Sequence, residues 1–351
     1  MHRVGLIGGS GYSGMELTRL LAGHPSLELA WVTSDRWQGE TVEARLGLRG
    51  QVGALRYLEV ERALAEVAGC QAVLLATPAE ASIAIVPRLL RQSLRVPLRI
   101  IDLSGAFRLA RPELYPAHYG FQHPAPELLA EAAYGLTDWF GNRAREARLV
   151  ANPGCYATAA ILALAPLLRD DLIGPDSLIV DAASGVTGAG RKASEELSFS
   201  EVADDVRAYK IFRHQHTPEI AQALAAIRGG PVELTFTPHL LPIRRGILCT
   251  AHARLRSGVK ASALQESLHK AYAGSAFVRV RPTPEEVSLR RTCFTNRCDV
   301  SAAADDQGRV VVMSALDNLL KGAAGQALEN LNLTLGFTQT AGLEGLNGAM
   351  G

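Results

Sequence analysis

The chain has 351 residues, of which 48% are hydrophobic, and its 36 basic and 35 acidic residues leave a formal net charge of +1. This length is enough for two domains with sizeable cores. A nearly neutral chain without blocks of basic residues is not expected to bind nucleic acid or an anionic membrane. We therefore expect a small-molecule partner.

The cysteines predict a reducing compartment. Five cysteines occur, an odd number, and none forms a C-x-x-C pair. Neither a disulfide framework nor a metal site is therefore expected. The first residues carry no signal-peptide pattern, and no apolar run approaches the length of a membrane span. These features together predict a cytoplasmic protein.

The N-terminal segment predicts a dinucleotide site. An apolar strand at residues 4–7 leads into G-G-S-G-Y-S-G at residues 8–14, and a helical pattern follows at 15–22. Gly9, Gly11 and Gly14 match G-x-G-x-x-G in the strand–turn–helix context in which backbone N–H groups cradle a pyrophosphate. A second strand at residues 27–33 favours this interpretation over a purely structural glycine loop.

The end of that second strand bears on the choice of cofactor. An acidic residue here typically holds the ribose hydroxyls of NAD, whereas small hydroxyl residues with an arginine suit the extra phosphate of NADP. Ser34 and Arg36 favour NADP(H). Asp35 leaves NAD open, and Arg36 could equally be a solvated loop charge.

Strands and helices continue to alternate as far as residue 151. This order predicts a parallel, doubly wound α/β sheet with ligands at the carboxyl ends of its strands. Thr77 follows one strand and should run beside the cofactor, whereas Arg108 follows another and suits either an anionic substrate group or a surface ion pair. Residues 114–126 are predicted to form a long loop. The further predicted strands are 72–76, 99–103 and 149–151, and the helices are 61–67 and 81–90.

Cys155 is the candidate nucleophile. Asn152, Pro153 and Gly154 predict a tight turn, and residues 157–165 predict a helix that ends near Pro166. A cysteine at a helix N-terminus is favoured as the thiolate, and the same free N–H groups can receive an oxyanion. The alternative is an inert cysteine that opens a buried helix.

The second half of the chain predicts a mostly antiparallel sheet, suited to a substrate and subunit-contact domain. Residues 184–191 form a glycine-rich segment expected to be a flexible loop. His214 and His216 are expected in an extended segment, where alternate side chains face the same way. His239 and Arg245 are expected in the connection between two strands. The predicted strands are 177–181, 232–237, 246–255, 277–280 and 310–314, and a helix is expected at the end of the segment 317–331.

Seven motifs follow one another in the order found in the N-acetyl-gamma-glutamyl-phosphate reductases, and the chain resembles that family over nearly its whole length. It is more distantly similar to the aspartate-semialdehyde dehydrogenases. The resemblance implies a Rossmann-type NADP domain of residues 1–154 and 316–351, an inserted catalytic and dimerisation domain of residues 155–315, and a homodimer or homotetramer. The motifs are G-G-S-G-Y-S-G, I-D-L-S-G-A-F-R-L, A-N-P-G-C-Y-A-T, S-G-V-T-G-A-G-R, H-Q-H-T-P-E-I, P-H-L-L-P-I-R-R-G-I-L and D-N-L-L-K-G-A-A-G-Q-A.

The same resemblance implies roles for individual residues. Cys155 matches the position of the family's nucleophile. His214 is the first candidate for the acid/base, and His216 is a close second candidate. Ala183 departs from the family pattern, which has a lysine before the glycine-rich segment. Positions around the acyl-phosphate substrate are Arg108, Ser184, Arg191, His239 and Arg245. Positions that contact the cofactor are Gly9, Ser10, Gly11, Tyr12, Ser13, Arg36, Ser184, Gly185 and Asn318.

The residues fit the chemistry that this resemblance implies. A thiolate attacks the acyl-phosphate carbonyl, the oxyanion is held by backbone N–H groups and by Asn152, and phosphate leaves to give a thioester that accepts hydride from NADPH. Two alternatives remain open. The acyl phosphate could be attached to a carrier protein of lysine or arginine biosynthesis, or the chain could bind NADP without catalysis.

Overall fold

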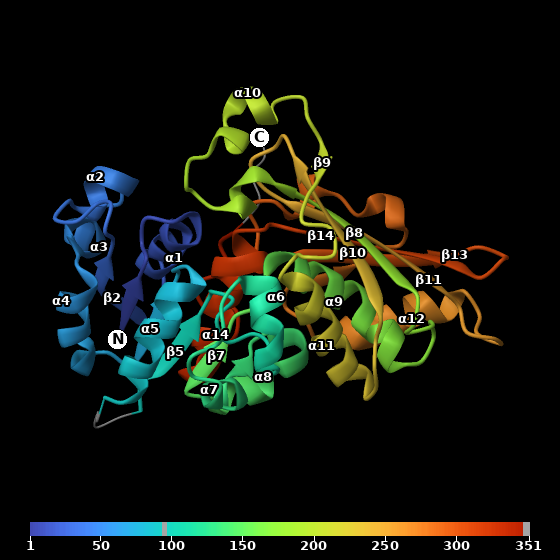
Figure 1. Ribbon diagram of the computed structural model, residues 1–351, viewed down its shortest axis with the longest axis horizontal. Coiled ribbons are helices and arrows are strands. Elements are labelled where there is room, and N and C mark those ends of the chain that lie inside the picture. The colour runs from blue at the N-terminus through green and yellow to red at the C-terminus, as the bar shows by residue number, and fades with distance from the viewer. Residues whose placement is uncertain (93–96, 347–351) are drawn as a thin grey trace. The chain divides into compact units, whose positions relative to one another are not determined.

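The computed structural model describes residues 1–92 and 97–346, which divide into two compact units (Figure 1). The first unit comprises Met1–Pro153 and Ala323–Gly345, and the second comprises Gly154–Gly322 together with Leu346. The chain therefore returns to the first unit after Gly322, later than the predicted boundary at residue 316. Residues 347–351, which were assigned to the cofactor domain, lie outside the described residues.

A parallel seven-stranded sheet forms the centre of the first unit. Its strand order is β3-β2-β1-β4-β5-β7-β6, and every neighbouring pair is parallel. This confirms the predicted doubly wound fold. The chain order reverses between β1 and β4, which makes their carboxyl ends the switch point where such sheets bind ligands. The strands are β1 His2–Ile7, β2 Leu27–Thr33, β3 Tyr57–Leu58, β4 Ala72–Leu75, β5 Arg99–Asp102, β6 Ala133–Tyr134 and β7 Leu149–Ala151.

The helices of the first unit include one where a loop was predicted. Within residues 114–126, Tyr115–Tyr119 form helix α6. The loop prediction is wrong here because Tyr115 is fully buried and its ring stacks on Tyr119 and meets His123 edge-on, so packing supports the helix. The helices are α1 Tyr12–Ala22, α2 Val42–Leu46, α3 Gly50–Ala54, α4 Val60–Ala65, α5 Ala79–Leu90, α6 Tyr115–Tyr119, α7 Glu127–Glu131, α8 Thr137–Glu146 and α14 Gly325–Thr334.

Helix α14 shows why the C-terminal segment belongs to the first unit. All of its residues are buried, although several are polar. Glu329 accepts a hydrogen bond from the Thr137 hydroxyl at 2.6 Å, and the Asn330 amide donates to the Gly135 carbonyl at 2.7 Å. Buried polar groups are tolerated when they are paired in this way.

The second unit is built on a mixed seven-stranded sheet with the order β12-β13-β14-β11-β8-β10-β9. The pairs β8–β10 and β12–β13 are parallel, and the other four are antiparallel. The prediction of a mostly antiparallel sheet is thus confirmed, although strands β9 and β13 were not predicted. The strands are β8 Leu178–Gly185, β9 Arg207–Ala208, β10 Leu234–Leu241, β11 Ile247–Arg254, β12 Val278–Val280, β13 Cys298–Ala304 and β14 Arg309–Leu316.

Helices cover one face of this sheet (Figure 1). The long helices are α9 Cys155–Arg169, α11 His216–Arg228 and α12 Ser262–Tyr272, with short helices α10 Phe199–Val202 and α13 Leu289–Thr292. Helix α9 runs through Pro166, so the predicted end there is wrong. Proline cannot donate to the carbonyl four residues earlier, and the Tyr272 hydroxyl donates to that Leu162 carbonyl at 2.6 Å instead.

Two negative findings concern the described residues 1–92 and 97–346. No helix among them combines the length and apolar character needed to cross a membrane. No group of three or more histidine, cysteine, aspartate or glutamate side chains among them is arranged to hold a metal ion.

Candidate active site

The glycine-rich turn after β1 leaves room for a ligand at one position only. A Cβ atom on Gly9 would lie 2.4 Å from a side-chain carbon of β2, and one on Gly14 would lie 2.1 Å from the Gly8 carbonyl oxygen. A Cβ on Gly11 would meet nothing closer than 3.9 Å. Gly9 and Gly14 are therefore required for packing, whereas Gly11 leaves the start of α1 open to a pyrophosphate. Ser10 lies in the same turn, and Tyr12 and Ser13 are the first residues of α1.

Ser34 and Arg36 differ in their surroundings at the end of β2. Ser34 is 3% exposed, and its hydroxyl accepts a hydrogen bond from the Trp37 N–H at 3.1 Å. Arg36 and Asp35 are both exposed. The arginine that was predicted to hold the extra phosphate of NADP is therefore accessible at the carboxyl edge of the sheet.

Arg108 is buried, so it does not form the surface ion pair that was its alternative. It is 8% exposed, and its guanidinium donates to the Asn152 carbonyl at 2.8 Å and to the Leu103 carbonyl at 2.7 Å. It thereby joins the end of β5 to the end of β7. The Asn152 amide nitrogen donates to the Ala323 carbonyl at 3.2 Å, and its oxygen accepts from Asn330 at 3.0 Å.

Cys155 is the first residue of α9, and Gly154 is its N-cap. The other cysteines are buried, whereas Cys155 is partly exposed. Burial raises the pKa of Cys249 to about 12 and that of Cys293 to about 11, which keeps both as inert thiols. Of the five cysteines, Cys155 alone combines a helix N-terminus with access.

His214 and His216 do not lie in an extended segment, and that prediction is wrong. His216 is the first residue of α11, and His214 precedes it in a turn. The two rings nevertheless meet, because the His216 N–H donates to His214 Nδ1 at 3.1 Å and the ring centroids are 4.7 Å apart. The turn and the start of α11 therefore bring together the two imidazole rings that an extended segment was expected to align.

Glu219 connects the histidine helix to the turn before Cys155. It is fully buried, and its Oε1 accepts a hydrogen bond from the Gly154 N–H at 2.8 Å. Its Oε2 lies 3.9 Å from His216 Nε2. A Cβ on Gly154 would lie 2.2 Å from that same His216 nitrogen, so only glycine fits there. Glu219 was not among the predicted site residues, although its place three residues after His216 puts both on one helix face.

Two tyrosines complete this part of the second unit and were also missed. The Tyr156 hydroxyl donates to the His239 carbonyl at 2.9 Å and accepts from the Tyr209 hydroxyl at 3.2 Å. Burial raises the pKa of Tyr209 to about 12 and also raises that of Tyr156. His239 lies within β10 rather than in the predicted connection, because β10 extends to Leu241.

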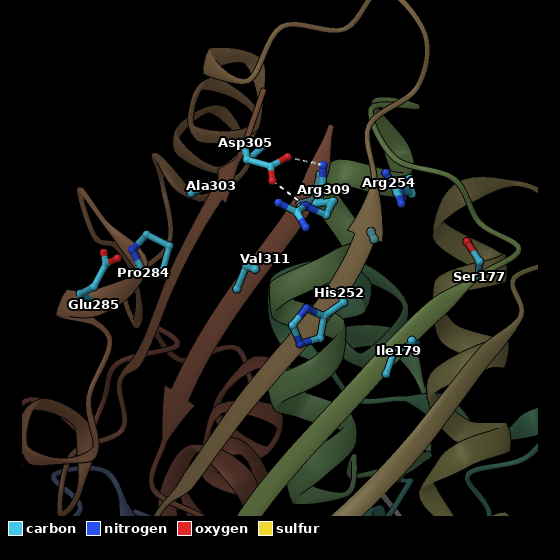
Figure 2. Close-up of a pocket in the computed structure, with 13 residues that line it drawn as sticks. Ser177, Ile179, His252, Arg254, Pro284, Glu285, Ala303, Asp305, Arg309 and Val311 are labelled. Carbon is cyan, nitrogen blue, oxygen red and sulfur yellow. Dashed lines mark hydrogen bonds and ion pairs between the residues drawn. The ribbon is translucent and has the colours of Figure 1, made fainter. Parts of the chain in front are cut away.

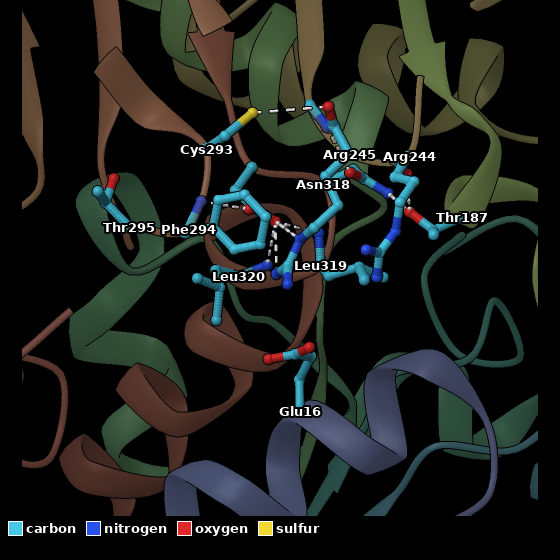
Figure 3. Close-up of polar contacts among 12 residues, drawn as sticks. Glu16, Thr187, Arg244, Arg245, Cys293, Phe294, Thr295, Asn318, Leu319 and Leu320 are labelled. Atoms are coloured by element: carbon cyan, nitrogen blue, oxygen red, sulfur yellow. Dashed lines mark hydrogen bonds and ion pairs between the residues drawn. The ribbon is translucent and has the colours of Figure 1, made fainter. Parts of the chain in front are cut away.

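The glycine-rich segment is only partly the loop that was predicted. Ser184 and Gly185 end β8, and Val186–Ala189 form a 3-10 turn. Asn318 holds this turn, because its amide nitrogen donates to the Thr187 hydroxyl at 3.0 Å while its oxygen accepts from the Gly246 N–H at 2.7 Å (Figure 3). Arg191 follows the turn and is half-buried, and Ala183 lies within β8.

Arg245 is held rigidly beside Asn318. Its guanidinium donates to Asp317 at 3.0 Å and lies 4.7 Å from the centre of the Phe294 ring (Figure 3). Phe294 has a φ of 62°, which is uncommon for a bulky residue, and its N–H donates to Asp317 at 2.7 Å. A buried carboxylate and an aromatic face thus fix the orientation of this cation.

Two family models match the chain. The semialdehyde dehydrogenase NAD binding domain matches residues 3–147, and the semialdehyde dehydrogenase dimerisation domain matches residues 155–318. Among solved structures, aspartate semialdehyde dehydrogenase II from Vibrio cholerae, complexed with ASA, covers 95% of this chain and 98% of its own, with a TM-score of 0.73 and 15% identity. At that identity the likeness shows a shared fold.

Curated relatives match over almost the full length. The N-acetyl-gamma-glutamyl-phosphate reductase of Acidithiobacillus ferrooxidans is 43% identical over 344 residues, and that of Laribacter hongkongensis is 45% identical over 347 residues. Both alignments cover 98% of this chain and 98% of the relative. The chain therefore belongs to the family of N-acetyl-gamma-glutamyl-phosphate reductases.

Proposed function

We propose that this chain catalyses the NADPH-dependent reduction of N-acetyl-glutamyl 5-phosphate to N-acetyl-glutamate 5-semialdehyde and phosphate, a step of arginine biosynthesis. The observation that carries the proposal is the placement of Cys155 at the start of α9, with His216 and Glu219 packed on the preceding glycine. The names of the full-length relatives support the same reaction. The five free cysteines support a reducing, cytoplasmic setting.

Cys155 acts as the nucleophile in this proposal. The thiolate sulfur forms a bond to the acyl carbon, and the carbon–oxygen bond to phosphate breaks, so that inorganic phosphate leaves and a thioester remains. The Gly154 N–H already donates to Glu219, so we assign the binding of the oxyanion to the N–H groups of the first turn of α9. Asn152, whose side chain is bonded within the first unit, then supports the turn.

His216 is the better candidate for the acid/base. Its Nε2 packs against Gly154, which is adjacent to Cys155 in sequence, and lies near the Glu219 carboxylate. His214 instead uses Nδ1 to accept the His216 N–H. In this assignment His216 protonates the departing group as the semialdehyde forms, and His214 orients His216.

The cofactor site fits NADP(H). Gly11 leaves the start of α1 open, and Arg36 is exposed at the end of β2. Bound NADPH supplies the hydride that reduces the thioester. We assign the pyrophosphate to the turn at Gly9–Ser13, the extra phosphate to Arg36 with Ser34 supporting the turn, and further contacts to Thr77, Gly185 and Asn318.

The residues proposed to bind the substrate lie mostly in the second unit. Arg245 is oriented by Asp317 and Phe294, and the Ser184 hydroxyl donates to the Gly185 carbonyl at 3.1 Å, so both are held in place. We assign Ser184, Arg191, His239 and Arg245 to the acyl phosphate. Arg108 donates to two backbone carbonyls, which makes it a support for the Asn152 turn as well as a candidate anion contact.

The assay that tests the function is the reverse reaction: NADP reduction with N-acetyl-glutamate 5-semialdehyde and phosphate. We expect phosphate-dependent turnover, faster with NADP than with NAD. An inactive wild type that turns over only a carrier-linked semialdehyde would move the chain to the carrier-dependent pathway. Binding of NADP without any turnover would identify a catalytically silent protein.

We also propose that the chain forms a homodimer through the uncovered face of the second sheet. Ile179, His252, Val311 and Ala303 are neighbours in register across β8, β11, β14 and β13, and they line a hollow of about 780 Å³ (Figure 2). Ile179 is 46% exposed although apolar. The match to a dimerisation domain supports a second copy as the occupant.

The Ile179→Arg variant is expected to be monomeric, because it places a charge on this apolar part of the face. Sedimentation velocity would measure the change, and Ile179→Val, which keeps the apolar surface, should remain in the wild-type assembly. An unchanged sedimentation coefficient for Ile179→Arg would rule out this face as the interface.

A further inference from the structure

A chain of three buried or half-buried oxygen groups connects the ends of two neighbouring strands in the first unit. Thr77, just after β4, shares a hydrogen bond with Ser82 on α5, with 2.9 Å between the hydroxyl oxygens. The Ser82 hydroxyl donates to Asp102 Oδ1, at the end of β5, at 2.8 Å. Ser82 and Asp102 are fully buried, whereas Thr77 is half-buried.

Asp102 is surrounded by hydrogen-bond donors, so its oxygens act as acceptors. Besides Ser82, it accepts from the Ser104 N–H at 3.1 Å and from the Ser104 hydroxyl at 2.7 Å. The Ser104 oxygen itself accepts from the Ala106 N–H at 3.1 Å, so its one hydrogen is directed to Asp102. Burial raises the pKa of Asp102, and these hydrogen bonds and the Arg108 charge offset that rise only in part.

Asp102 Oδ1, which also accepts from the Ser104 N–H, sets the direction of the whole chain of hydrogen bonds. A serine hydroxyl has one hydrogen, and that of Ser82 is used on Asp102. The hydrogen between Thr77 and Ser82 must then come from Thr77. The Thr77 oxygen is left with lone pairs and no hydrogen to offer, so toward a ligand it can only accept.

Thr77 stands where a dinucleotide is expected. It follows β4 at the switch point of the sheet, and its methyl carbon lies 3.1 Å from where a Cβ on Gly8 would be, beside the glycine-rich turn. An obligate acceptor repels phosphate oxygens but matches a ribose hydroxyl or the carboxamide N–H2 of the nicotinamide.

We propose that Ser82 and Asp102 are positioning residues which orient the Thr77 hydroxyl as an acceptor for a hydrogen-bond donor of the bound NADP(H), away from its phosphates. This rests on the proposed cofactor of the chain. It names the part of the cofactor that Thr77 recognises, and it explains a buried carboxylate that the thioester chemistry does not use.

A double-mutant cycle on NADP+ affinity tests the proposal in the full chain. Titration calorimetry should give a Kd roughly three- to tenfold higher for Thr77→Val and for Ser82→Ala than for the wild type, the size expected for one lost hydrogen bond. Because both variants remove the same oriented bond, the double variant should bind no more weakly than Thr77→Val. Thr77→Ser, which keeps the hydroxyl, should bind as the wild type does.

A control variant and a cofactor analogue distinguish the possible hydrogen-bond donors. Thr334→Val removes a buried hydroxyl of the same unit that bonds within its own helix, and it should leave Kd unchanged. The 3-acetylpyridine analogue of NADP+ has no carboxamide N–H2. If the carboxamide is the donor, Thr77→Val and the wild type should bind this analogue with the same Kd. If a ribose hydroxyl is the donor, Thr77→Val should raise the Kd of the analogue as much as it raises that of NADP+.

Additive losses for Thr77→Val and Ser82→Ala, or an unchanged Kd for Thr77→Val, would overturn the proposal. So would a wild type that does not bind NADP+. The outcome of this test is separate from that of the proposed function. If the chain binds NADP+ and the losses of the two variants are not additive, the proposal about Thr77 is supported even when no semialdehyde is turned over, a result that would refute the proposed reaction.

Discussion

The Cys155→Ala variant is expected to fold and to bind NADP+ with wild-type affinity, yet to lose turnover by a factor on the order of 10⁴ or more. Without the thiolate no thioester can form, and the cofactor turn lies in the other unit. Cys155→Ser should be nearly as inactive, because an ordinary ester is a weaker electrophile than a thioester. Initial rates of phosphate-dependent NADP reduction measure both variants.

Cys249→Ala is the matched control for Cys155. Cys249 is a fully buried thiol of the same unit, on β11. Its truncation should lower the midpoint of unfolding, because it leaves a small cavity in the core, and should keep most of the turnover. Substantial activity in Cys155→Ala, measured beside that control, would exclude the thioester mechanism.

The Glu219→Ala variant is expected to show the second-largest loss, about 10²-fold in kcat. It removes the acceptor of the Gly154 N–H and the carboxylate beside His216, so the turn before the nucleophile and the imidazole both lose a support. The bond to the buried carboxylate also contributes about 1.5–3 kcal/mol to folding. NADP+ affinity should change little.

Glu219→Gln distinguishes an electrostatic role from a structural one. The amide can still accept the Gly154 N–H but carries no charge, and a nearby negative charge favours the protonated imidazole. Neutralising it should lower the pKa of His216, so the corresponding limb of the kcat/KM profile should move to lower pH. If that limb of the kcat/KM profile does not move, Glu219 has a structural role and no electrostatic one. Glu233→Gln, an exposed carboxylate of the same unit, should leave the profile unchanged.

Local patterns in the sequence predicted much of the first unit. Strands β2 and β7 coincide with the predicted residues 27–33 and 149–151, because buried parallel strands are short apolar runs bounded by turn residues. The glycine-rich turn and the start of α9 at Cys155 were also predictable. Each depends on residues within a few positions of one another.

Errors arose where the packing of side chains decided the local structure. Helix α9 continues through Pro166 because Tyr272, far along the chain, bonds the carbonyl that proline leaves without a donor. Helix α6 forms within the predicted loop because Tyr115 is buried and packs against Tyr119 and His123, which are close in sequence but have no pattern that predicts a helix. Tyr272 cannot be identified as the partner of the Leu162 carbonyl from the sequence near Pro166.

The parallel cofactor fold, the family and the candidate nucleophile could be predicted from the sequence, since these depend on short-range periodicity and on motifs a few residues long. Three contacts became known from the folded chain alone: Glu219 accepts the Gly154 N–H, His216 rather than His214 faces that glycine, and Ser82 joins Thr77 to Asp102. Hydrogen bonds form between atoms about 3 Å apart whatever their separation along the chain, so their partners are known only once the chain has folded.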